Sequence, residues 1–324
     1  MIDFKKAQEI INHKISAIEI SREPLELYEP VKYIISIGGK RIRPALVLMS
    51  CSLFSEQITH AIKPALAIEL FHNFTLLHDD IMDNSVLRRN KPTVHKKWNR
   101  NIAILSGDVM AILSYKFIAD CPPGVLPTVL DLFTETALQV CEGQQYDMDF
   151  EKRTDISIDD YLRMIELKTS VLIASSLKLG AILGGASLTD TILLYEFGRN
   201  LGIAFQLRDD MLDVFGDTDK FGKKIGMDII ANKKTYLFLK AVEIAERETK
   251  DQLLQLFSTH DLDPEEKVSR VKTIFTQLGI KKITEDTSMD YFEQAVRKLD
   301  MVSVPEERKY MLKNFAEQLM EREQ

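Results

Sequence analysis

The chain has 324 residues, of which 45% are hydrophobic and 28% are charged, as is usual for a globular protein with a large apolar core. Its formal net charge of −7 argues against a general nucleic-acid binder, because such proteins carry a basic stripe. The three cysteines, Cys51, Cys121 and Cys141, are scattered without metal-ligand spacing, which fits a reduced cytoplasmic compartment.

Helical patterns dominate the chain from its first residues. Residues 1–16, MIDFKKAQEIINHKIS, alternate charged and apolar side chains and predict an amphipathic helix rather than a signal peptide. Apolar residues recur at helical spacing in 70–81 and, less cleanly, in 192–215, whereas alternating strand patterns are nearly absent. We therefore expect one all-α domain over residues 1–324, organised as a multi-helix bundle.

The most apolar stretch is 170–188, which is rich in serine and glycine and interrupted by Lys178. This composition predicts a buried helical hairpin rather than an integral membrane segment. Proline and glycine at 122–124, and the sequence DLDP at 261–264, predict turns between helices.

A cluster of three aspartates lies in the sequence HDDIMDNSVLRR, residues 78–89. Asp79 and Asp83 are four residues apart and share one face of a helix, with Asp80 about 100° away. Carboxylates this close repel each other by about 4 kcal/mol at 4 Å and an effective dielectric of 20. The cluster is therefore favourable only if a cation binds it.

The same spacing occurs again at Asp209, Asp210 and Asp213, at the end of a second apolar helical run. A single trio is more often a solvated acidic turn, but two trios of identical spacing are much less expected by chance. Carboxylates in this arrangement suit Mg²⁺, which keeps waters and substrate phosphates among its ligands. The lack of a histidine or cysteine cluster beside the trios argues against zinc.

Basic residues alternate with the two trios along the chain. They follow the glycine pair Gly38-Gly39 and the first trio, and they flank the second trio. This alternation indicates a polyphosphate that is bridged by Mg²⁺ and bound by arginine and lysine. No Walker-type glycine loop is present, so a nucleotide is not favoured.

Three blocks, GGKRIRP, LLHDDIMDNSVLRR and QLRDDMLDVFGD, together resemble the trans-prenyltransferases, the polyprenyl diphosphate synthases. The resemblance implies an all-α fold around a central active-site cavity and a homodimer. It also implies the reaction, in which isopentenyl diphosphate is added head to tail to an allylic diphosphate. The allylic diphosphate ionises to a carbocation, the alkene attacks it, and a proton is lost, for which the resemblance suggests the departing diphosphate as acceptor.

The family pattern assigns the metal and catalytic residues. By resemblance, Asp79 and Asp83 bind Mg²⁺, and Asp209 binds a further Mg²⁺, with three ions expected in each active site. The catalytic set also contains the neighbouring aspartates and one lysine: Asp80, Asp210, Asp213 and Lys168.

The family pattern also assigns the two substrate pockets. Residues that match the isopentenyl diphosphate pocket are Lys40, Arg43, His72 and Arg89. Residues that match the allylic side are Arg88, Lys168, Thr169, Gln206, Lys223 and Lys233. Without the resemblance, His72 is equally well a core histidine, although on an ideal helix it lies close to the stripe of Asp79 and Asp83. Asn90 and Asn232 occur where the family often has glycine, and asparagine also tolerates left-handed backbone angles.

Product length in this family depends on residues upstream of the first trio. Phe74 and Thr75, five and four residues before Asp79, resemble short-chain enzymes that make geranylgeranyl diphosphate, and Phe71 is the next barrier. Farnesyl or a somewhat longer prenyl diphosphate is the alternative product. Ideal helix geometry puts Phe74 about 140° from Asp79, so Phe74 as an ordinary core residue stays an alternative.

Two other classes of protein use similar sequences. A terpene cyclase would usually replace the second trio by an Asn/Ser/Glu pattern, which is absent here. A non-catalytic subunit of a heteromeric synthase would be expected to lack one trio or the basic residues. Both trios and the basic residues are present, so the sequence favours a cytoplasmic enzyme that needs Mg²⁺ and prenyl diphosphates.

Overall fold

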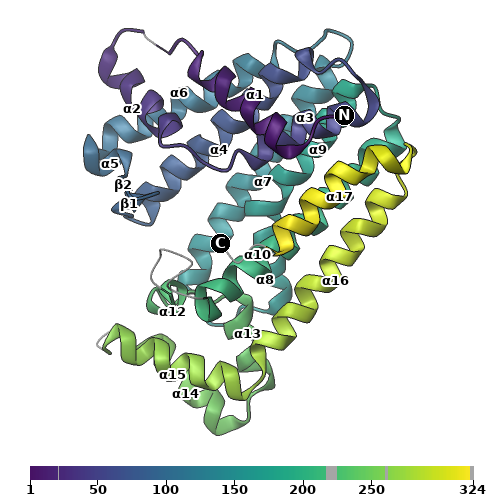
Figure 1. The fold of residues 1–324 in the computed structure, drawn as a ribbon. Helices are drawn as coiled ribbons and strands as arrows, with labels where there is room; N and C mark the ends of the chain where they lie inside the picture. The colour runs from purple at the N-terminus through teal and green to yellow at the C-terminus, as the bar shows by residue number, and fades with distance from the viewer. Residues whose placement is uncertain (21, 217–224, 260–261, 322–324) are drawn as a thin grey trace. The chain divides into compact units, whose positions relative to one another are not determined.

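The computed structural model describes residues 1–20, 22–216, 225–259 and 262–321 (Figure 1). The strands of this described part form one short antiparallel pair, in which Leu87 faces Pro92 and Arg88 faces Lys91. All other regular structure in these ranges is helical, which confirms the expected all-α fold.

The described elements follow one another along the chain in this order: α1 (Phe4–Ser16), α2 (Leu25–Ser36), α3 (Ile42–Phe54), the 3₁₀ turn η1 (Thr59–Ala61), α4 (Ile62–Met82), β1 (Leu87–Arg88), β2 (Lys91–Pro92), α5 (Val94–Lys97), α6 (Arg100–Ile118), α7 (Leu126–Lys152), α8 (Ile158–Ile165), the π-helical turn η2 (Glu166–Ser170), α9 (Val171–Gly184), α10 (Leu188–Phe215), α12 (Met227–Ile230), α13 (Tyr236–Ile244), α14 (Arg247–Ser258), α15 (Pro264–Gln277), α16 (Ile280–Asp300) and α17 (Glu306–Glu321).

The chain divides into two compact units. Unit 1 contains Met1–Glu135, Ser175–Leu194 and Val302–Leu312. Unit 2 contains Thr136–Ala174, Tyr195–Met301 and Lys313–Gln324. The first aspartate trio belongs to unit 1 and the second belongs to unit 2. The single-domain organisation expected from the sequence stays a prediction.

The core of unit 1 forms where α4 packs along α6 (Figure 1). The side chains of Leu70 and Leu77 on α4 are buried together with Ala103 and Met110 on α6. Because α4 buries apolar residues on most of its surface, burial rather than intrinsic propensity stabilises this helix. The two acidic residues Asp79 and Asp80 therefore lie on a helix whose position is fixed by its core contacts.

Unit 2 has its own apolar core. Tyr161 and Ile165 of α8, Leu207 of α10 and Phe238 of α13 are buried in one cluster. Ser157 begins α8 with a capping box, because its hydroxyl accepts from the Asp160 N–H and the Asp160 carboxylate accepts from the Ser157 N–H. The helix then passes directly into the π-helical turn η2, a local geometry that is frequent at functional sites.

The structure confirms the helix expected near the N-terminus and the turn at 122–124, which lies between α6 and α7. The stretch 170–188 differs in detail from a hairpin: α9 ends at Gly184, and the partner helix α10 begins only at Leu188. Gly185 lies between them at φ 83°, a left-handed conformation that glycine adopts without strain. Of the turn expected at 261–264, Asp261 is outside the described residues, and Asp263 caps α15.

Two described helical stretches are long and apolar enough to cross a membrane by length and composition alone. The apolar window of 158–184 is 72% buried, as in a core helix of a soluble protein. The window of α6 is only 33% buried, so this helix exposes apolar side chains.

Candidate active site

The first trio lies at the C-terminal end of α4. Asp79 and Asp80 occupy its last turn and Asp83 is the C-cap residue. Backbone carbonyls make this end of a helix electronegative, so three carboxylates are unfavourable there. The arrangement therefore has a strong electrostatic preference for a bound cation.

Arg88 neutralises one of the three aspartates. Its Nε lies 2.9 and 2.8 Å from the two carboxylate oxygens of Asp80, and its Nη2 lies 2.7 Å from Oδ1. The side chain of Asp80 is 1% exposed, and burial raises its pKa although Arg88 opposes this shift. Arg88 Nη2 is 3.8 Å from Asp79 Oδ2, and the side chain of Asp79 is 19% exposed. Asp80 is thus buried and paired with Arg88, whereas Asp79 and Asp83 lie toward the surface.

A tight hairpin carries Arg88. It turns at Arg89 and Asn90, whose φ angles are 52° and 61°. Two successive residues with positive φ are the signature of a type I′ hairpin, which matches the twist of short antiparallel strands. Asn90 and Asn232, with φ 58°, both adopt the left-handed angles that the sequence predicted. The Tyr33 hydroxyl donates to the Pro92 carbonyl at 2.8 Å and attaches the hairpin to α2.

The glycine pair before α3 makes room for Arg89. Arg89 Nη1 donates to the Gly38 carbonyl. A Cβ atom on Gly39 would lie 2.7 Å from Arg89 Nη2, and Gly39 has φ 145°. The backbone angle therefore requires glycine at this position, and a side chain there would also displace the Arg89 guanidinium.

Arg43 and His72 form the centre of a basic cluster in unit 1. Arg43 Nη1 lies 3.3 Å from His72 Nε2. Burial and the surrounding arginines lower the pKa of His72 well below its ordinary value, so the imidazole is neutral near pH 7. Burial lowers the pKa of Arg43 to about 10, and its buried Nε has no hydrogen-bond partner among the described residues. Such a cluster suits a bound dianion.

The residues predicted to limit product length belong to an aromatic cluster. The ring centroid of Phe71 lies 5.4 Å from that of Phe74 and 5.3 Å from that of Phe133. Phe74 also contacts the ring of His78 at 4.8 Å. Phe71 is 2% exposed, whereas Phe74 is half-buried and Thr75 Oγ1 donates to the His72 carbonyl. Their role in product length stays a prediction.

The second trio repeats the arrangement of the first within unit 2. Asp209 is exposed, whereas Asp210 is buried near the end of α10. Asp210 Oδ1 accepts from Gln206 Nε2 at 2.9 Å and Oδ2 accepts from the Tyr161 hydroxyl. Burial raises the pKa of Asp210 to about 7, with a further increase from the nearby Asp228. Asp213 Oδ2 accepts from the Asp228 N–H at 3.0 Å.

Asp147 on α7 joins two of the predicted allylic-side lysines. Its Oδ2 lies 2.6 Å from Lys168 Nζ and 3.9 Å from Lys233 Nζ. Burial opposes ionisation of Asp147, but Lys233 and Lys168 outweigh it and keep its pKa below the ordinary value. Gly143 permits this approach, because a Cβ there would collide with the Lys168 backbone.

Unit 2 therefore brings together most of the residues predicted for the allylic side. Thr169 Oγ1 donates to Gln206 Oε1 at 3.2 Å, and Gln206 contacts Asp210 in turn. Lys223 lies in 217–224, outside the described residues. The sequence analysis missed Asp147, Tyr161 and Asp228. A sequence signal for Asp147 existed, because Lys168 lies in an otherwise apolar stretch and a lysine there is expected to have an acidic partner.

The donor chemistry of the trios fits Mg²⁺. Within the described ranges, no three or more His, Cys, Asp and Glu side chains form a ready-made metal cluster. The aspartates left toward the surface, Asp79, Asp83 and Asp209, provide oxygen ligands only. Because Mg²⁺ usually binds one or two protein carboxylates and fills its octahedron with waters and phosphates, this sparse set suits it.

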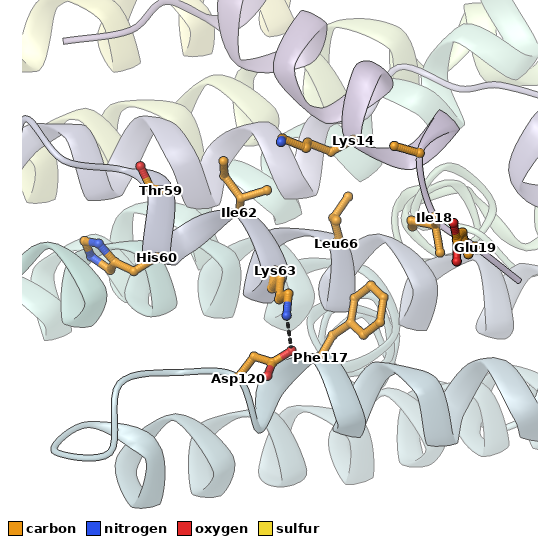
Figure 2. A pocket seen from close by; sticks show the side chains of 11 residues that line it. Lys14, Ile18, Glu19, Thr59, His60, Ile62, Lys63, Leu66, Phe117 and Asp120 are labelled. Carbon is orange, nitrogen blue, oxygen red and sulfur yellow. Dashed lines mark hydrogen bonds and ion pairs between the residues drawn. The ribbon is translucent and has the colours of Figure 1, made fainter.

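A pocket of about 460 Å³ lies elsewhere in unit 1, between the C-terminal end of α1, η1 and the adjoining ends of α4 and α6 (Figure 2). Apolar side chains such as Leu66 and Phe117 line it, and Lys63 forms an ion pair with Asp120 at 2.7 Å beside it. Among the described residues, none of those predicted for the site lines this pocket.

The model of the polyprenyl synthetase family matches residues 24–278 of the chain. The chain belongs to this family. It is a trans-prenyltransferase of isoprenoid biosynthesis, and the alternative classes considered for the sequence, a terpene cyclase and a non-catalytic subunit, are not favoured. Membership of the polyprenyl synthetases also implies dependence on a divalent metal.

Individual relatives of this polyprenyl synthetase agree. The chain is 37% identical over 303 residues to the geranylgeranyl diphosphate synthase of Methanosarcina mazei, covering 93% of this chain and 91% of that protein. A crystal structure of a geranylgeranyl pyrophosphate synthase matches with a TM-score of 0.95 and 44% identity, over 99% of both chains. A geranylfarnesyl diphosphate synthase from Aeropyrum pernix is 35% identical over 322 residues, 97% of this chain and 99% of that protein.

Proposed function

We propose that the protein makes geranylgeranyl diphosphate by adding isopentenyl diphosphate to a shorter allylic diphosphate in the presence of Mg²⁺. The observation that carries the proposal is the difference in burial between the aspartates of each trio. Asp80 and Asp210 are buried and hydrogen-bonded inside the protein, while Asp79, Asp83 and Asp209 lie toward the surface. Relatives named geranylgeranyl diphosphate synthase support the product.

The basic residues divide between the two substrates. Lys40, Arg43, His72 and Arg89 hold the diphosphate of isopentenyl diphosphate. Residues on the allylic side are Arg88, Lys168, Thr169, Gln206, Lys223 and Lys233. Charge-assisted hydrogen bonds from arginine and lysine favour the dianionic diphosphate and orient the two reacting carbons.

The proposed reaction proceeds by ionisation, condensation and elimination. Three Mg²⁺ ions, bound by Asp79, Asp83 and Asp209, would neutralise the diphosphate leaving group. Lys168 donates hydrogen bonds to the diphosphate, whose negative charge grows when the allylic C–O bond breaks. The alkene of isopentenyl diphosphate then attacks the allylic cation, and the proton lost from the new cation passes to the departing diphosphate. Apolar helices exclude water that would otherwise quench the cation.

Incubation of the purified protein with Mg²⁺, isopentenyl diphosphate and each allylic primer tests the proposal. We expect a twenty-carbon product as the main species. A farnesyl or geranylfarnesyl main product would reject the proposed product but keep the reaction. If no primer is elongated under any Mg²⁺ concentration, the proposed activity is wrong.

We also propose that the protein is a homodimer, as the family resemblance implies, and that α6 contributes to the interface. Leu105 and Ile112 are 57% and 68% exposed on a helix whose other face packs on α4. Burying such side chains against a second copy is favoured by about 25 cal/mol per Å² of apolar surface. Sedimentation should give a dimer for the wild type and a monomer for Ile112→Glu. Leu188→Glu, at a residue that is 76% exposed on α10, is the matched control and should stay dimeric.

We propose a cytoplasmic location. Cys51, Cys121 and Cys141 are free thiols, which fits a reducing compartment, and burial raises the pKa of Cys51 to about 11. Cell fractionation should recover the protein with the soluble fraction. Recovery in the membrane fraction after a high-salt wash would contradict this location.

A further inference from the structure

Arg41 differs from its basic neighbours in the GGKRIRP segment because its side chain points into unit 1. The side chain is 3% exposed, whereas Lys40 is exposed and Arg43 lies beside His72. Its guanidinium donates to the carboxylate of Glu69, to the Ile35 carbonyl at 2.8 Å and to Asn12 Oδ1 at 3.3 Å. Arg41 thus connects the start of α3 with α1, α2 and α4, and it is too buried to reach a substrate.

Glu69 places this connection directly behind the basic cluster. It is buried on α4, three residues before His72 and therefore about one helical turn away. Asn73 Nδ2 donates to the same Glu69 oxygen at 3.0 Å, so the carboxylate has two partners. On the α1 side, Gln8 Nε2 donates to the Lys40 carbonyl at 2.9 Å. The Gln8 contact holds the backbone directly before Arg41, and the ion pair holds the Arg41 side chain.

The backbone at Arg41 is itself strained. Arg41 is the residue before α3 and has φ 52°, in the left-handed region that is unfavourable for a residue with a Cβ atom. A buried ion pair adds little net stability, because removing two charges from water offsets their attraction. A strained backbone and a buried charge at the same residue do not stabilise the fold. They are more typical of a residue that holds neighbouring groups in one geometry.

We propose that Arg41 is a positioning residue for isopentenyl diphosphate, and that its ion pair with Glu69 fixes the turn from which Lys40 and Arg43 reach the diphosphate beside His72. This rests on the proposed assignment of Lys40, Arg43 and His72 to that substrate. Arg43 follows Arg41 by two residues and His72 follows Glu69 by three, so the ion pair sets the distance between the two binding groups.

The test removes the ion pair without leaving a buried charge. Arg41→Met combined with Glu69→Met should leave the melting temperature within a few degrees of the wild type. The KM for isopentenyl diphosphate should rise at least tenfold, while the KM for the allylic primer changes less than twofold. Arg41→Lys, which keeps the charge but cannot reach all three acceptors, should give an intermediate rise. If the double variant does not fold, the KM values of Arg41→Lys decide the question: a rise for isopentenyl diphosphate that exceeds the rise for the allylic primer supports the proposal, and an unchanged KM or an equal rise for both overturns it.

Asp190→Asn is the matched control. Asp190 is also a buried acid of unit 1, but it hydrogen-bonds to Ser187 and Ser303 instead of the GGKRIRP segment. Its substitution should lower stability without a selective change in either KM. A selective rise in the KM for isopentenyl diphosphate in this control would overturn the proposal. A general loss of stability in unit 1 would then be sufficient to produce the same effect as the Arg41 and Glu69 variants.

Arg43→Ala, measured in parallel, separates the positioning role of Arg41 from the assignment of the pocket to isopentenyl diphosphate. An unchanged KM for isopentenyl diphosphate in the Arg41 and Glu69 variants, together with a raised KM in Arg43→Ala, overturns the positioning role alone. Unchanged values in all variants overturn the assignment of the pocket and the positioning role with it. An equal rise for both substrates also rejects the proposal.

Discussion

Arg88 and Asp80 are joined by three hydrogen bonds of 2.7 to 2.9 Å, and this contact distinguishes Asp80 from Asp79 and Asp83, which lie toward the surface. A carboxylate bound by a guanidinium has few lone pairs left for a metal ion. Asp210 is occupied in a different way, by Gln206 and Tyr161. The middle aspartate of each trio is thus buried and hydrogen-bonded, through unrelated partners.

Asp79→Ala and Asp209→Ala should each lower turnover by orders of magnitude and leave the fold intact. Each substitution removes one carboxylate from a closely spaced group of carboxylates, so the melting temperature should stay equal or increase. Product formation measured over a Mg²⁺ titration checks this. Asp290→Ala, at an exposed aspartate on α16, is the control. Near-wild-type turnover with unchanged Mg²⁺ dependence in either trio variant would contradict the role of both trios.

Arg88→Ala should destabilise the protein by roughly 3 kcal/mol, because it leaves the buried carboxylate of Asp80 without its cation. Asp80→Asn should cost less, since no buried charge remains. Urea unfolding gives both free energies, and the double variant should recover part of the loss of Arg88→Ala. Strictly additive losses in the double variant would show that the two residues do not interact energetically.

Arg43→Ala should raise the KM for isopentenyl diphosphate far more than that for the allylic primer. A charge-assisted hydrogen bond is worth roughly 1.5–3 kcal/mol, which corresponds to about a 10- to 150-fold change in affinity. Steady-state kinetics with each substrate varied in turn measures both constants. The assignment to isopentenyl diphosphate fails if the two constants rise together.

His72 should make the ligand-free protein less stable in acid. Its folded pKa lies below the unfolded value of about 6.5, so the unfolded state binds more protons. The stabilisation is present above pH 6.5 and is lost as the pH falls toward the folded pKa. The free energy of unfolding of His72→Gln should therefore fall less between pH 7 and 5 than that of the wild type.

Phe74→Ala should lengthen the product if this ring closes the space beneath the growing chain. Phe74 is half-buried, so its loss should cost less than the roughly 3–5 kcal/mol typical of a fully buried phenylalanine. Phe71→Ala, at a ring that is 2% exposed, should reach that larger cost. Product analysis and melting temperatures from the same preparations test both statements. Unchanged products together with a large loss of stability would assign Phe74 to the core.

Local sequence patterns predicted the helical fold and the backbone angles of two turns. The spacing of Asp79 and Asp83 depends only on helix geometry, and the left-handed angles at Asn90 and Asn232 depend only on local sterics. Each of these features is decided within a few residues of chain. Such features are therefore readable before any tertiary contact is known.

The partners of the buried charges were not predictable in the same way. Asp147 meets Lys168 across 21 positions of sequence, and Tyr161 meets Asp210 across 49. Neither separation follows from a helical repeat, because the contacts depend on how α7, α8, η2 and α10 pack within unit 2. The inward orientation of Arg41 was not predictable from the sequence either, because its neighbours Lys40 and Arg43 carry the same charge and only tertiary packing distinguishes them.

The two-residue turn at Arg89 and Asn90 also restricts how this region can change in evolution. Arg88 binds Asp80, whereas the adjacent Arg89 binds the Gly38 carbonyl, so neighbouring residues serve different partners. The spacer 84–87 sets which arginine meets which partner. Deleting one residue from it would bring Arg89 toward Asp80 and leave Gly38 with no arginine, even though every charged residue was retained. Homologous enzymes should therefore tolerate substitutions in this spacer far more readily than insertions or deletions.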